Sequence, residues 1–106
     1  MFDIKSKCES EYLDLDKYKN NNGNIIYCKK DTDIAHNPYG PAIIWSNGSK
    51  FYCIENECHR LDGPAVIYCD GKEQYWINDR WMTKEQFEVH PKRLKYLGKE
   101  RLICLI

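Results

Sequence analysis

Hydrophobic and polar residues alternate in short runs through the middle of the chain, and dipeptides that favour tight turns separate these runs. Asn-Gly occurs at residues 22–23 and 47–48, and Asp-Gly occurs at 70–71. Such dipeptides favour the two-residue type I′ turn, whose central residues both have positive φ. The pattern therefore predicts three consecutive antiparallel β-hairpins.

The hairpins belong to a repeat with a period of 23 residues, because residues 36–58 and 59–81 align without a gap. Such a period is typical of stacked supersecondary units. A degenerate copy at about 13–35 lacks the Gly-Pro-Ala phrase of the other two, as expected of a terminal repeat that caps a stack. The identical pairs are His36/His59, Gly40/Gly63, Pro41/Pro64, Ala42/Ala65, Ile44/Ile67, Gly48/Gly71, Tyr52/Tyr75 and Ile54/Ile77.

We therefore expect a single domain over residues 1–106 that is mainly β. It consists of stacked antiparallel β-hairpins that form one twisted sheet, with a short C-terminal helical segment. The helix and tail occupy 82–106, where Thr83-Lys84-Glu85-Gln86 fits a capping box and predicts a helix from about Lys84 to Val89. Pro91 is expected to open another turn with Gly98 as a C-cap, and the apolar ending at 102–106 is expected to be buried as a helix or an edge strand.

A two-residue turn at 70–71 would place Val66 opposite Tyr75, and residues that lie opposite one another share a face. We expect the face with more aromatic and branched residues to be the covered one. That face carries Val66, Tyr68, Tyr75 and Ile77, matched by Ile43, Trp45, Tyr52 and Ile54 and by Ile25 and Tyr27. The other face carries Ala65, Ile67, Cys69, Gln74 and Trp76, matched by Ala42, Ile44, Ser46, Phe51 and Cys53.

Local backbone requirements explain the repeated phrase that ends in Gly-Pro-Ala. Gly40 and Gly63 supply an unusual φ or a close approach, and Pro41 and Pro64 start a strand where no amide is needed. The recurring histidines, His36 and His59, are interpreted as structural, because no nucleophile recurs beside them. Tyr52 and Tyr75 are interpreted in the same way, as stacked core residues.

Sixteen basic and sixteen acidic residues give a formal net charge of zero, so no long-range field draws the protein to nucleic acid or to an anionic membrane. The locally basic segment 91–106 is interpreted as a solvated face with its leucines turned inward. The first ten residues lack the apolar core of a signal peptide, and no run approaches the roughly 20 apolar residues of a spanning helix. We expect a cytoplasmic protein without membrane contact.

Six cysteines occur in the chain, and without a sign of an oxidising compartment they are expected to be reduced. Cys28 and Cys53 correspond to Trp76 in the last repeat, which indicates packing. The only spacing with a hint of metal ligation is Cys53, Cys58 and His59, a weak alternative because paired Cys-x-x-Cys knuckles are absent. We expect no metal and no cofactor.

The phrase His-x-x-x-Gly-Pro-Ala, followed by Asp/Asn-Gly and then Tyr, resembles MORN-type repeats. Residues 59–65, His-Arg-Leu-Asp-Gly-Pro-Ala, resemble most closely the variant found in small phage, viral and bacterial proteins. The resemblance covers about 20–91 and departs from the pattern at Asp79, where Gly is customary, and at 37–39. It implies stacked hairpins that serve as a scaffold for contacts with another molecule, and not an enzyme.

Three functions follow as hypotheses. The first is a protein-binding module, of the kind that a phage or mobile element uses to inhibit a host defence protein, such as an anti-CRISPR protein in the host cytoplasm. The second is a sponge for a nucleotide immune signal, with charge from Arg60, Arg80, Lys50 and Lys72, and the third is an antitoxin-like binding protein. Candidate contact residues break the repeat identity: Arg60, Gln74, Trp76, Arg80 and Trp81. Open sheet edges or the C-terminal tail also allow a homo-oligomer.

Overall fold

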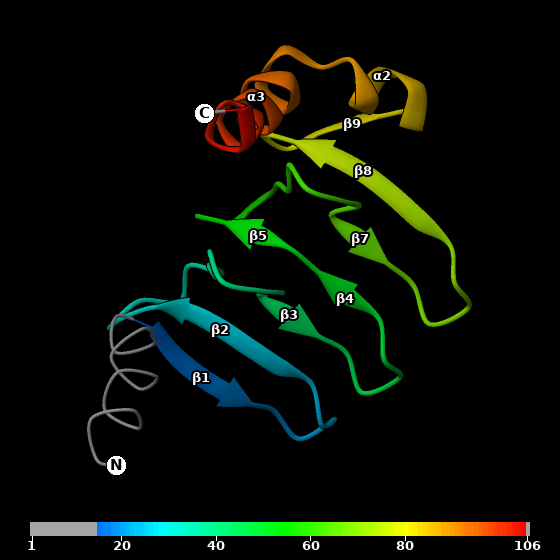
Figure 1. The fold of residues 1–106 in the computed structure, drawn as a ribbon. Coiled ribbons are helices and arrows are strands. Elements are labelled where there is room, and N and C mark those ends of the chain that lie inside the picture. The colour runs from blue at the N-terminus through cyan, green and yellow to red at the C-terminus, as the bar shows by residue number, and fades with distance from the viewer. Residues whose placement is uncertain (1–14, 106) are drawn as a thin grey trace.

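The structure, a computed structural model, describes residues 15–105 and the side-chain surroundings of residues 15–98. Seven strands form one antiparallel sheet in the order β1-β2-β3-β4-β7-β8-β9 (Figure 1). Strand β5 pairs with β6 in a separate two-stranded sheet. This arrangement confirms the predicted mainly β class with stacked hairpins and a C-terminal helical segment. The elements are β1 Leu15–Lys19, β2 Ile25–Lys29, β3 Ile43–Ile44, β4 Lys50–Phe51, β5 Cys53–Ile54, β6 Glu57–Cys58, β7 Val66–Ile67, β8 Glu73–Ile77, β9 Arg80–Met82, α2 Lys84–Glu88 and α3 Pro91–Leu105.

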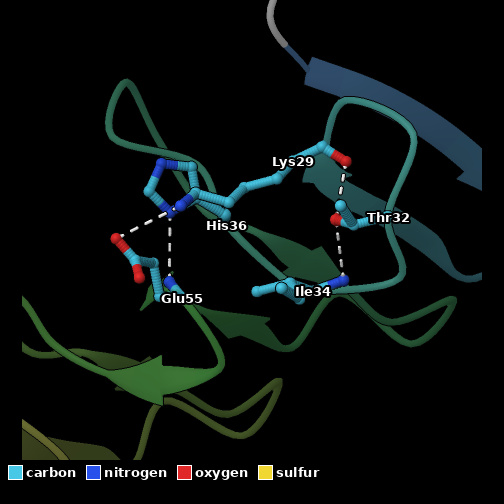
Figure 2. A network of polar contacts seen from close by, with 5 residues as sticks. All are labelled: Lys29, Thr32, Ile34, His36 and Glu55. Carbon is cyan, nitrogen blue, oxygen red and sulfur yellow. Dashed lines mark hydrogen bonds and ion pairs between the residues drawn. The ribbon is translucent and has the colours of Figure 1, made fainter.

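The sequence period reappears in the backbone hydrogen bonds. The N–H of Tyr27 donates to the carbonyl of Ala42, and the N–H of Tyr52 donates to Ala65, both at 2.7 Å. Each alanine in turn donates to the next strand, Ala42 to Phe51 at 2.8 Å and Ala65 to Gln74 at 2.9 Å. Each repeat therefore joins the next with the same bonds. Lys29 and Ile34 lie at the two ends of the loop that follows β2 (Figure 2).

The turns at the predicted dipeptides differ from the prediction, because each loop contains three residues. Tyr68 donates its N–H to Lys72 at 2.8 Å and accepts from Gly71 at 2.9 Å, and Val66 pairs with Gln74 instead of Tyr75. Of the loop residues, only the glycine has positive φ, 93° at Gly71. This geometry is that of a type I turn followed by a glycine bulge. Asp70 avoids positive φ, and its carboxylate accepts from the N–H of Lys72 at 3.0 Å.

Turns with two consecutive positive-φ residues do occur, but between β5 and β6 and between β8 and β9. Glu55 and Asn56 have φ of 49° and 68°, and Asn78 and Asp79 have φ of 50° and 65°. The two turns are equivalent positions of successive repeats, and neither contains glycine. The type I′ turn was therefore predicted in the wrong connection: it follows the second strand of each predicted hairpin instead of joining the two strands of that hairpin.

The one-residue change of register makes the predicted face assignment wrong, because the second strand of each hairpin turns over relative to the first. Phe51 lies with Trp45 and Tyr68 instead of opposite to them, and Trp45 and Tyr68 are 41% and 36% exposed rather than covered. We call one face the tryptophan face: Trp45, Phe51, Val66, Tyr68, Gln74, Trp76 and Trp81. The opposite, tyrosine face carries Ala42, Tyr52, Ala65, Tyr75 and Ile77, each next in sequence to a residue of the tryptophan face or, for Ala42, to Ile43, which pairs with Phe51.

Helix α2 covers the end of the tyrosine face. Its capping box is formed as predicted, with Thr83 accepting from the N–H of Gln86 and Gln86 accepting from that of Thr83. Phe87 packs against the buried side chains of Ile77 and Met82, and the three form a cluster of buried residues. The predicted helix at 84–89 is therefore confirmed, with Val89 as its C-cap.

Helix α3 runs from Pro91 to Leu105 through Gly98, so the predicted C-cap at Gly98 is wrong. Gly98 lacks the positive φ that such a cap requires, and the residues on either side of it are good helix formers. Leu94 is 50% exposed, contrary to the expectation that the leucines point inward. Among the described residues, no helix is both long enough and apolar enough to cross a bilayer.

Candidate functional site

The recurring histidines hold the two type I′ turns. Nδ1 of His36 accepts from the N–H of Glu55, and Nδ1 of His59 accepts from the N–H of Asn78, both at 3.0 Å (Figure 2 shows the first). Each donor is the first positive-φ residue of its turn. Both histidines therefore make the same turn contact in successive repeats, which is the kind of contact that a structural role would use.

The second residue of each turn completes the joint to the neighbouring repeat. Asn56 exchanges two bonds with Ala35, donating its N–H at 2.8 Å and accepting at its side-chain oxygen at 2.7 Å. Asp79 does the same with Cys58, at 2.8 and 3.2 Å. The departure from Gly at Asp79 thus supplies a side-chain acceptor that Gly would lack.

Burial lowers the pKa of His59, and the nearby ammonium of Lys92 lowers it further, while Glu57 opposes both effects. A neutral imidazole is the form that accepts at Nδ1, which places its proton on Nε2. Lys92 also donates to the side-chain oxygen of Asn78 at 2.6 Å. Helix α3 therefore contacts the same turn that His59 holds.

Arg60 is engaged within the chain. Its Nε lies 2.8 Å from Oδ1 of Asp62, its Nη1 donates to the carbonyl of Pro64 at 3.0 Å, and its guanidinium carbon lies 4.0 Å from the ring centroid of Tyr52. A Cβ on Gly63 would come within 3.0 Å of that carbon. Close approach, and not positive φ, is therefore the reason for glycine here.

Asn37 occupies the equivalent place one repeat earlier. Its amide nitrogen donates to the carbonyl of Pro41 at 3.1 Å, which matches the bond from Arg60 to Pro64. Its oxygen accepts from the N–H of Tyr39 at 2.9 Å. The shorter side chain reproduces the loop bond, and no cation of the loop covers the tyrosine face there.

A cleft of about 460 Å³ lies between the loops at 37–41 and 59–62 and is bounded on one side by α3. Its volume falls within the range of small-molecule sites, roughly 300–1,000 Å³. The side chains that could contact a ligand there include Tyr39, Tyr52, Tyr96, His59, Arg60 and Asp62.

One repeat further on, the helices fill the equivalent place. Phe87 of α2 packs on Tyr75 with ring centroids 4.7 Å apart, where the repeat pattern would put an arginine. Arg93 of α3 lies 4.6 Å from the Phe87 centroid and donates to the carbonyl of Leu61 at 2.8 Å. The C-terminal helices therefore close the stack.

The tryptophan face brings together three of the predicted contact residues. Nε1 of Trp76 donates to Oε1 of Gln74 at 3.0 Å, and Trp81 lies directly opposite Trp76 in the β8–β9 pair. Arg80 pairs with Ile77 and so belongs to the opposite face, and Arg60 lies in the cleft. A contact role for any of these five residues stays a prediction.

The prediction of contact residues missed an aromatic cluster at the other end of this face. Phe51 makes edge contacts with both Trp45 and Tyr68, with ring centroids 6.1 Å apart in each case. Trp45 and Tyr68 are equivalent positions of successive repeats. The two-residue turn assumed from the sequence put Phe51 on the other face, whereas a three-residue loop at 46–48 puts it beside Trp45. The length of the loop was therefore the information needed to find this cluster.

Cys28 and Cys53 are buried, as their predicted packing role requires. Cys53 and Cys58 face each other across β5 and β6, but Nδ1 of His59 is bonded to Asn78. Within residues whose side chains are described, no three His, Cys, Asp or Glu residues are grouped so as to hold a metal ion. The structure thus gives the weak Cys53, Cys58 and His59 metal alternative no support.

Comparison with models of protein families, with curated proteins and with solved structures gave no match. The resemblance to MORN-type repeats therefore rests on the residues quoted for it.

Proposed function

We propose that this chain is a non-enzymatic, repeat-built protein-binding module that docks through the tryptophan face. The observation that carries the proposal is the position of the tryptophans: Trp45, Trp76 and Trp81 all project from one face of the sheet. Helix α2 contacts the opposite face at Tyr75, and α3 contacts the carbonyl of Leu61 in the loop beside it. Among the described residues, no helix therefore lies on the tryptophan face.

Exposure argues against a purely internal role for these aromatic residues. Trp81 is 57% exposed, and Trp45 and Tyr68 are also exposed at the turn end of the sheet. Trp and Tyr are enriched among the interface residues whose loss weakens binding most. Removing such a ring from water against a partner contributes on the order of 2 kcal/mol.

The chemistry of the face favours a protein surface over nucleic acid. Its central row across the sheet is uncharged: Ile26, Ile43, Phe51 and Gln74 are partly exposed, and Val66 between them is buried. Faces that stack single-stranded bases combine their aromatic residues with cations that follow the phosphates. An apolar patch on the partner is the better complement.

The finer proposal is that the partner is a host defence protein and that the chain is an inhibitor of phage or mobile-element origin. It rests on the resemblance of residues 59–65 to repeats of small phage and viral proteins. An antitoxin-like role would use the same face against a different partner.

The test is co-purification with tagged chain from a host lysate, followed by measurement of affinity for the recovered partner. We expect Trp81→Ala and Trp45→Ala each to weaken that affinity at least about tenfold, since each removes an anchor worth more than 1 kcal/mol. Lys50→Ala, on the opposite face, is the matched control. Equal affinity of all variants, or no stoichiometric partner, would contradict the proposal.

A second candidate function is the binding of an anionic small ligand in the cleft beside Tyr52. The volume of the cleft and the three tyrosines that line it favour this function. Of the four basic residues expected to supply charge to a nucleotide, Arg60 lines the cleft and Arg80, Lys50 and Lys72 do not. Calorimetry with cyclic nucleotides and ADP-ribose derivatives tests the candidate, with Tyr96→Ala as the variant that should abolish binding. No heat with any of these compounds would remove it.

A further inference from the structure

Cys53 and Cys58 are directly opposite one another in the β5–β6 hairpin. The same position holds Cys28 opposite Ala35 in the first repeat and Trp76 opposite Trp81 in the last. Only the middle repeat therefore places two thiols face to face at this point of the hairpin.

The backbone bonds around the pair show how close the two residues come. The carbonyl of Cys53 accepts from Asn37 at 3.0 Å, and the N–H of Cys58 donates to Asp79 at 3.2 Å, so neither bond joins the pair itself. The next pair outward is bonded, from His59 N–H to Tyr52 at 3.1 Å. Non-hydrogen-bonded pairs have Cα atoms about 4.5 Å apart. That spacing lies within the range of disulfides, about 4.4–6.8 Å.

The two thiols also differ in their chemistry. A hydrogen bond from the Cys53 thiol to Cys58 lowers the pKa of Cys58 and raises that of Cys53, whose burial raises it further. Cys58 is half-buried, whereas Cys53 is buried. Cys58 is thus the thiol better placed to react first, because both access and thiolate character favour it.

We propose that Cys53 and Cys58 are a reversible oxidation site, which forms a cross-strand disulfide by exchange with a low-molecular-weight disulfide such as glutathione disulfide. The Cys58 thiolate attacks one sulfur of glutathione disulfide, forming a mixed disulfide and releasing one glutathione thiolate. Cys53 then attacks Sγ of Cys58 as its proton leaves, and the second glutathione thiolate is expelled. The two thiol protons neutralise the two thiolates, so two protein thiols are oxidised as one glutathione disulfide is reduced.

The bond would act on the joint between repeats. Cys58 is held by Asp79 of the following turn, and Cys53 is held by Asn37 of the preceding loop. A bond between their sulfurs would fix the positions of both neighbours, so oxidation would stiffen the middle of the array. The inference does not depend on the proposed function.

The experiment uses the full-length chain equilibrated in buffers of increasing glutathione disulfide content. Free thiols are then alkylated, and the chain is digested with trypsin. Both cysteines fall in one tryptic peptide, residues 51–60, and cleavage after Glu55 or Glu57 separates them unless a disulfide joins them. We expect two hydrogen atoms to be lost from this peptide, with its halves still joined and with no glutathione attached.

Ala35→Cys is the matched control, because it puts a thiol opposite Cys28 at the equivalent pair. We expect a disulfide between residues 28 and 35 in this variant, whereas Cys28 of the natural chain faces an alanine and stays available for alkylation. Cys53→Ser should trap glutathione on Cys58, with circular dichroism confirming the fold. Stable glutathionylation of Cys58 in the natural chain, or alkylation of both thiols at every ratio, would overturn the proposal.

Discussion

Nδ1 of His59 accepts a hydrogen bond at 3.0 Å from the backbone N–H of Asn78, 19 residues further along the chain. The N–H belongs to a residue with φ of 50°, in the left-handed region that costs most non-glycine residues about 1–2 kcal/mol and Asn less. The imidazole thus stabilises a strained turn that the backbone alone disfavours. His36 and Glu55 repeat the arrangement.

His59→Ala should destabilise the fold, because it leaves the turn N–H without its acceptor. We expect the free energy of unfolding to fall by about 1 kcal/mol, the usual value of one hydrogen bond. Urea denaturation followed by circular dichroism measures the change. His36→Ala should lose a similar amount, and an unchanged midpoint in both variants would contradict the structural role.

The stability of the chain should decrease in mild acid. Because the folded-state pKa of His59 is lowered, the unfolded chain binds the proton more readily. The contribution of neutral His59 is complete above the unfolded value of about 6.5 and is lost as pH falls below it toward the folded pKa. Thermal unfolding between pH 8 and pH 5 tests this.

His59→Gln is the control for the acid effect, because an amide oxygen can accept the same bond without titrating. We expect its melting temperature to change less than that of the natural chain over the same pH interval. Parallel curves for the two proteins would assign the acid sensitivity to other groups.

Gly63→Ala and Gly40→Ala form a matched pair at one repeat position. A Cβ on Gly63 would meet the Arg60 guanidinium at 3.0 Å, whereas a Cβ on Gly40 would have its nearest contact at 4.0 Å. We expect Gly63→Ala to cost about 1 kcal/mol, because the Arg60 guanidinium must shift away from the added Cβ and its contacts with Tyr52 and Pro64 weaken, and Gly40→Ala to be neutral or slightly stabilising. Adding Arg60→Ala should remove most of the difference between the two, as a double-mutant cycle would show.

Replacement of a turn glycine should cost stability through the backbone alone. At Gly48 and Gly71, with φ of 98° and 93°, an added Cβ meets nothing within 4 Å. We expect about 1–2 kcal/mol for Ala at either site and less for Asn, which tolerates this conformation. Asp70→Ala should cost less than Gly71→Ala, because residue 70 avoids positive φ; equal costs would favour the two-residue turn.

The repeat, the strands and the capped helix could be predicted because they depend on local residue types. The register could not, since Asn-Gly and Asp-Gly fit both a two-residue turn and a bulged three-residue turn. Contacts between repeats accompany the bulged form: Asn24 accepts from the N–H of Ser46 at 2.8 Å, and Ser49 accepts from that of Cys69 at 3.0 Å. A single sequence does not reveal such partners.

The unknown strand register also explains why the aromatic residues of the candidate site were assigned to the wrong faces of the sheet. One residue of register decides whether Phe51 lies beside Trp45 or behind it, so the tryptophan face could not be assigned from composition. Trp76 and Trp81 were identified because they break the repeat identity, and that criterion is independent of register. Trp45 was not identified because the two-residue turn placed it on the face expected to be covered, where it is in fact 41% exposed.

Phe87 on Tyr75 gives the array a finite length. Since α2 and α3 take the place that another repeat would need, growth by one unit at that end requires the helices to move outward with the new end. At the opposite end, no strand of the described segment pairs with the outer edge of β1. The two ends of the described array therefore differ: the C-terminal helices occupy the place of a further repeat, and β1 is the outermost strand of the described sheet at the other end.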